Sequence, residues 1–152
     1  MNGTTPDTNT TPGTSATPDT NTEPVMEIEP VVEIDDGRTW TPVCRYRDLD
    51  PGRGIAVLVG PRDEQVALFR ERGGTVHALA NRDPFSGAHV ISRGLLGSRL
   101  GVPVVISPMF KHAFELRTGR SLDEPHTPDG IPADLRVWPV RVVAGTPAEV
   151  NR

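Results

Sequence analysis

Asn81-Arg82-Asp83-Pro84-Phe85-Ser86 is one of two stretches that decide the fold, and the other is Ser107-Pro108-Met109-Phe110-Lys111-His112. Each stretch follows an apolar run, at residues 75–80 and 102–106, that is typical of a β-strand. Each contains a proline, which cannot donate a ladder hydrogen bond and therefore ends a strand in a turn. The two stretches predict a pair of loops that leave a sheet at the ends of two strands.

The sequence from residue 38 onward consists of short apolar runs separated by glycine and proline turns. A short turn of helix is expected at residues 46–52, where Pro51-Gly52 ends it. No stretch repeats its apolar residues with the period of a longer helix. This pattern favours an all-β fold of stacked antiparallel sheets. The expected strands are residues 40–44, 55–59, 65–70, 75–80, 102–106, 113–117 and 136–143.

The first 37 residues differ in composition from the rest. They contain eight acids and no Lys or Arg, whereas residues 38–152 hold all 16 basic residues against 12 acids. We therefore expect a disordered, acidic, Thr/Pro-rich tail at residues 1–37 and a single domain at residues 38–152. Residues 25–34 alternate apolar and acidic side chains. This segment is either an extended linker or a strand that adds to a sheet edge.

Several classes of protein are disfavoured by composition. Cys44 is the only cysteine, so the chain cannot form an internal disulfide, and a reducing compartment fits. No apolar run approaches the roughly 20 residues of a membrane span, and no secretory signal is visible at the N-terminus. Aromatic residues make up only 5% of the chain, and no nucleic-acid-binding motif surrounds the basic residues. We expect a cytoplasmic protein that binds neither membranes nor nucleic acid.

Three motifs carry a resemblance to a known family: Asn-Arg-Asp-Pro-Phe-Ser-Gly-Ala at 81–88, Ser-Arg-Gly-Leu-Leu-Gly at 92–97, and the run at 107–119. Together they resemble the small subunit of assimilatory NAD(P)H-dependent nitrite reductase, over roughly residues 38–143. The resemblance implies a Rieske-like fold. In a true Rieske domain the two loops carry Cys-x-His and Cys-x-x-His, which hold a [2Fe–2S] cluster.

The corresponding positions lack those ligands here. They hold Asn81, Asp83, Ser107 and Phe110, and none is a thiolate or an imidazole. We therefore expect no catalytic, cofactor-binding or metal-binding residue in this chain. Asn81 and Asp83 are expected to bond backbone N–H groups, as they do in turns. Phe110 is expected to pack inward where a cluster would lie, because an empty cavity is costly, with Phe85 or Met109 facing outward.

The resemblance also implies a partner. The large subunit of this family carries FAD, a [4Fe–4S] cluster and sirohaem and reduces nitrite to ammonium, and the small subunit supports it without carrying electrons. An apolar and basic loop surface is a candidate docking site for that subunit. The residues assigned to docking are Arg82, Phe85, Arg93, Met109 and Lys111.

Two other functions remain open. A Rieske-type electron-transfer ferredoxin would need four cluster ligands, and the single cysteine lies outside the loops. A stand-alone protein-binding module or small enzyme is the other alternative, although the sequence has no nucleophile–base pair and no glycine-rich phosphate loop.

Overall fold

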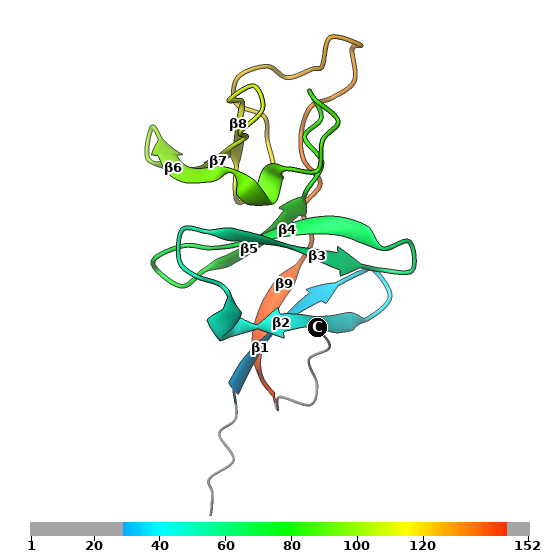
Figure 1. The fold of residues 1–152 in the computed structure, drawn as a ribbon, viewed down its shortest axis with the longest axis vertical. Coiled ribbons are helices and arrows are strands. Elements are labelled where there is room, and N and C mark those ends of the chain that lie inside the picture. Colours follow the sequence, from blue (N-terminus) through cyan, green and yellow to red (C-terminus); the bar gives the residue numbers. More distant parts are fainter. Residues whose placement is uncertain (1–28, 146–152) are drawn as a thin grey trace, which may run out of the picture.

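The computed structural model describes residues 29–145 of the 152-residue chain (Figure 1). Within these residues, strands form three antiparallel sheets of three strands each, with the orders β2-β1-β9, β3-β4-β5 and β6-β7-β8. The strands are β1 (Glu29–Asp35), β2 (Trp40–Arg45), β3 (Gly54–Val59), β4 (Glu64–Arg70), β5 (Val76–Ala80), β6 (Leu95–Arg99), β7 (Val102–Ile106), β8 (Ala113–Glu115) and β9 (Val140–Gly145). Two 3-10 helices, η1 (Tyr46–Asp48) and η2 (Ile91–Arg93), complete the described fold, so the predicted all-β class is confirmed.

Strand β1 is the central strand of the first sheet, between β2 and β9. Its apolar side chains Val32 and Ile34 are fully buried, whereas Glu33 bonds Arg141 of β9 at 2.8 Å. The alternation of apolar and acidic residues is therefore the pattern of a half-buried strand. The predicted domain start near residue 38 is too late, because the sheet includes residues from Glu29 onward. Residues 1–28 of the predicted tail and residues 146–152 of the predicted domain lie outside the described residues.

The second sheet is the middle layer of the molecule (Figure 1). Its central strand β4 is buried on both faces, since alternate side chains of a strand point to opposite sides. Val66 and Leu68 belong to a core shared with the first sheet. Ala67 and Phe69 belong to a second core shared with the third sheet. This layer therefore fixes the third sheet and its loops on the rest of the fold.

The third sheet contains the one described strand that the sequence analysis missed. Strand β6 is an edge strand with Leu95 70% exposed, and it contains Gly97 and Ser98, so it lacks the apolar alternation that marks a strand. Gly94 immediately before it approaches β7 closely, because a Cβ there would lie 2.6 Å from the Ile106 carbonyl oxygen. Glycine at this position lets β6 pair with β7.

Two element boundaries differ from the predictions. Strand β9 begins at Val140 and not at 136, because residues 136–138 pair with β5 first, with Trp138 N donating to Ala78 O at 3.0 Å. The predicted helical turn at 46–52 is only the three-residue helix η1. Among residues 29–145, no helix is long and apolar enough to span a membrane.

Candidate functional site

The two loops predicted from the sequence lie together beside the third sheet, and with it they form a lobe above the middle sheet (Figure 1). The first follows β5 and the second follows β7. A single hydrogen bond joins them, because the Ser107 hydroxyl donates to Asp83 Oδ2 at 2.5 Å. Both side chains are completely buried. The positions that would carry cluster ligands in a Rieske domain are therefore linked here by a direct side-chain contact.

Asp83 organises the first loop through its other carboxyl oxygen. Oδ1 accepts the backbone N–H groups of Phe85 at 2.7 Å and Ser86 at 3.3 Å. The Ser107 hydroxyl plays a similar part in the second loop, where it accepts the N–H of Met109 at 3.3 Å. The prediction that these residues hold the loops by bonding backbone groups is confirmed for Asp83, and Ser107 does the same.

Asn81 ties the first loop to its surroundings. Its Nδ2 donates to Gln65 Oε1 on β4 at 3.0 Å, and its Oδ1 accepts the N–H of Ser92 in η2 at 2.7 Å. The side chain is 1% exposed, so both bonds satisfy polar atoms that water cannot reach. Asn81 thus anchors the first loop to the middle sheet and to the 3-10 helix η2.

Phe85 packs against the second core, whereas the sequence predicted that either Phe85 or Met109 faces outward. Its ring stacks on His112 with centroids 3.7 Å apart and planes 10° from parallel, and it lies 6.3 Å from the ring of buried Phe114. No role for His112 was predicted from the sequence. Alternation could have indicated one, because His112 and Phe114 are two residues apart beside β8 and so face the same side.

Phe110 lies at the surface, and the prediction that it packs inward is wrong. Its side chain is 60% exposed, and Met109 beside it is 42% exposed. The reason is that the stacked rings of Phe85 and His112 already cover the second core, so Phe110 only meets the edge of His112, with centroids 6.4 Å apart. Lys111 follows with φ of 64°, a left-handed conformation that turns the chain back toward β8.

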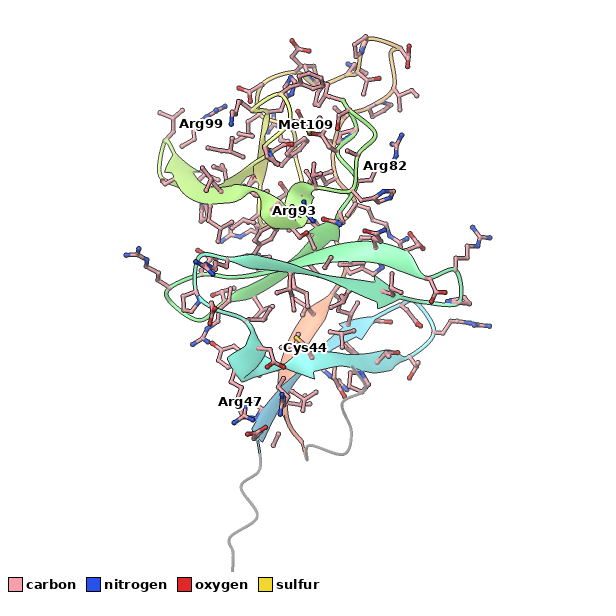
Figure 2. The ribbon with its side chains drawn as sticks, viewed as in Figure 1. Cys44, Arg47, Arg82, Arg93, Arg99 and Met109 are labelled. Atoms are coloured by element: carbon pink, nitrogen blue, oxygen red, sulfur yellow. The ribbon has the colours of Figure 1, made fainter. Side chains whose placement is uncertain are left out.

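The stretch of chain from the first loop through the second carries mostly positive charges. Residues 81–112 contain four cations and one acid, Asp83, which is buried. Among the cations, Arg99 pairs with Asp123 at 2.6 Å. Within residues 29–145 the other three form no side-chain hydrogen bond or ion pair: Arg82, Arg93 and Lys111. Figure 2 places Arg82, Arg93 and Met109 in the same lobe, and Cys44 below the middle sheet.

Asp123 holds the far end of the second loop. One oxygen accepts the N–H of Ala113 at 2.7 Å and the other meets Arg99. Partial burial acts to raise the pKa of Asp123, but the hydrogen bond from Ala113 and the contact with Arg99 outweigh it, so this pKa lies below its ordinary value.

Comparison with known proteins places the chain in a family. Residues 39–148 match the family model of the Rieske-like [2Fe-2S] domain. The chain is 40% identical over 86 residues to the nitrite reductase (NADH) small subunit of Salmonella typhimurium, which is 56% of this chain and 78% of that one. The chain belongs to the Rieske-like family of nitrite reductase small subunits.

Other relatives of this Rieske-like chain extend the comparison. Over 108 residues it is 43% identical to the nitrite reductase [NAD(P)H] large subunit of Klebsiella oxytoca, covering 71% of this chain but only 10% of that protein. A crystal structure described as an NADH-dependent nitrite reductase small subunit from Mycobacterium tuberculosis has 41% identity and a TM-score of 0.53, covering 76% of this chain and 98% of that one. The NMR structure of E. coli NirD has 32% identity and a TM-score of 0.52, covering 66% and 96%.

The loop residues of this Rieske-like domain do not fit a [2Fe–2S] cluster. Such a cluster needs two thiolates and two imidazoles. Asp83 and Ser107 are bonded to each other, and the Phe110 ring is exposed and has no donor atom. Cys44 lies in the core between the first and middle sheets. Among residues 29–145, no three His, Cys, Asp or Glu side chains are grouped so as to hold a metal ion.

Proposed function

We propose that this chain is the non-catalytic small subunit of a cytoplasmic NAD(P)H-dependent nitrite reductase, which reduces nitrite to ammonium. It works in complex with a large subunit that carries FAD, a [4Fe–4S] cluster and sirohaem. The observation that carries the proposal is the 40% identity to nitrite reductase small subunits. The subunit contributes by association, because its loops are closed by the bond between Asp83 and Ser107 and offer no cluster ligands.

The Klebsiella oxytoca relative supports a physical association. A segment 43% identical to this chain is part of the same polypeptide as that large subunit. A domain that is covalently joined to a large subunit in one protein is a natural binding partner when it is a separate chain in another. The rigid, hydrogen-bonded loops are also suited to binding, because a preorganised surface loses less conformational entropy when a partner docks.

The proposal is tested by co-expression of the full chain with the large subunit of its own nitrite reductase. We expect the two chains to co-elute, and nitrite-dependent oxidation of NAD(P)H by the large subunit to rise when the small subunit is added. We expect the small subunit alone to show no turnover and no visible absorption after purification from iron-replete cells. Independent elution with unchanged turnover would refute the proposal, and an iron–sulfur absorption spectrum would favour the ferredoxin alternative.

A further inference from the structure

The second loop presents two large apolar side chains to solvent on a firmly held backbone. Phe110 and Met109 are 60% and 42% exposed. Ser107 N donates to His112 O at 2.9 Å, and Lys111 N donates to Ser107 O at 3.1 Å, so the loop is closed on itself. The left-handed backbone at Lys111 adds strain of the kind that accumulates at binding sites. A fixed, exposed aromatic side chain is the usual anchor of a protein interface.

Three cations that form no ion pair within residues 29–145 lie on the two loops and on η2 between them. Arg82 directly precedes Asp83, whose carboxyl binds Ser107, and Lys111 binds the carbonyl of the same Ser107. Arg93 follows Ser92, whose N–H binds Asn81 in the first loop. Lys111 follows Phe110 directly in the chain, and Figure 2 shows Arg82 and Arg93 in the same lobe as Met109. The only acid in residues 81–112, Asp83, is buried. Arg82 is set apart from the other two cations, because the exposed Asp129 and Asp134 line the same pocket.

We propose that Phe110 and Met109 enter an apolar pocket on the large subunit, and that Arg93 and Lys111 meet a rim of Asp and Glu carboxylates around that pocket. This inference rests on the proposed function and specifies its interface. Charge complementarity identifies the rim, and the covalent linkage of a similar domain to the Klebsiella oxytoca large subunit identifies the occupant. Phe85 leaves the docking set, because its partly buried ring stacks on His112 and packs against the second core.

The interface is tested by measuring the dissociation constant of the full chain and the large subunit, with Phe110→Ser and Met109→Ser. The matched control variants are Leu58→Ser on β3 and Val142→Ser on β9, whose side chains are 60% and 42% exposed outside the third sheet and its loops. We expect Phe110→Ser to weaken binding by about tenfold or more, as for a central apolar anchor. The controls should stay within about twofold of the wild type, and all four variants should keep the thermal midpoint of the wild type.

The contribution of the cations is measured separately, through the rate of association with the large subunit. Reversing charge in Arg93→Glu and Lys111→Glu should slow association by roughly tenfold at low salt and flatten its salt dependence. Arg62→Glu, at an exposed turn between β3 and β4, is the matched control and should leave the rate unchanged.

The outcomes separate the two proposals. If the wild type does not bind the large subunit, the proposed function fails. If the wild type binds and Phe110→Ser binds equally well, the interface inference is wrong while the proposed function stands. If Phe110→Ser instead abolishes self-association and leaves binding to the large subunit unchanged, the apolar pair joins two copies of this chain, and the inference is likewise overturned.

Discussion

The two loops occur in similar sequence contexts, but their side chains pack differently. Each follows an apolar strand and contains a proline, yet the first buries Asp83 and packs Phe85 inward, whereas the second buries only Ser107 and exposes Met109 and Phe110. The first loop supplies the carboxylate that joins the two loops, and the second supplies the exposed apolar surface. In this fold the first loop joins the two loops together and the second exposes an apolar surface, whereas in a true Rieske domain both loops bind the cluster.

The largest expected effect comes from the anchor. Asp83→Ala removes the acceptor of the Ser107 hydroxyl and of two backbone N–H groups, all in the loop interior. We expect it to lower the free energy of unfolding by about 3 kcal/mol, because buried donors are left without partners. Urea denaturation of the wild type and the variant measures this.

A double-mutant cycle checks that the effect passes between the loops. Ser107→Ala alone should cost about 1 kcal/mol, and the pair of changes should cost less than the sum of the single changes. Purely additive costs would mean that the contact between Asp83 and Ser107 does not join the loops energetically.

The two phenylalanines should differ in kind. Phe85→Ala removes a ring that packs on His112 and the second core, so we expect it to lower stability by about 2 kcal/mol. Phe110→Ala should change stability by less than about 0.5 kcal/mol, since its ring is exposed. Thermal and urea unfolding of the two variants side by side give the comparison, and equal losses would contradict the different packing of the two rings.

The strained residue of the second loop should respond in the opposite direction. Lys111 has φ of 64°, which favours glycine over residues with a Cβ. Lys111→Gly should therefore raise the free energy of unfolding by about 1 kcal/mol, partly offset by the greater freedom of glycine in the unfolded chain. Gly87→Ala in the first loop, where φ is 78°, is the mirror control and should destabilise by a similar amount.

The smallest effect is on pH dependence. Because the pKa of Asp123 lies below its ordinary value of 3.8 in the folded state, the unfolded chain binds more protons near that pH. The stability from this group is present above pH 3.8 and is lost as pH falls through the folded pKa. Urea denaturation between pH 5.5 and pH 3 should therefore show a smaller loss for Asp123→Asn than for the wild type, and equal losses would contradict the assignment.

Some features of the fold followed from local patterns. The apolar run before the second loop coincides with β7 at both ends, because an apolar run bounded by turn residues is a reliable strand signal. The sequence does not decide between an extended linker and a strand for residues 25–34, where β1 lies. The acidic residues of β1 find their partners only across the sheet, as Glu33 does with Arg141. The orientation of Phe110 was not predictable, since it depends on a stack between Phe85 and His112 that are 27 positions apart in sequence.

Residue types and their spacing were enough to predict an all-β chain with two loops that lack cluster ligands. They were also enough to indicate the family of the chain. These properties are local, because turn residues and strand patterns act over a few positions. Only the tertiary structure decided that Asp83 and Ser107 bind each other, that Phe85 stacks on His112, and that Phe110 is exposed. Burial and pairing of loop side chains depend on segments distant in sequence, and no local pattern contains that information.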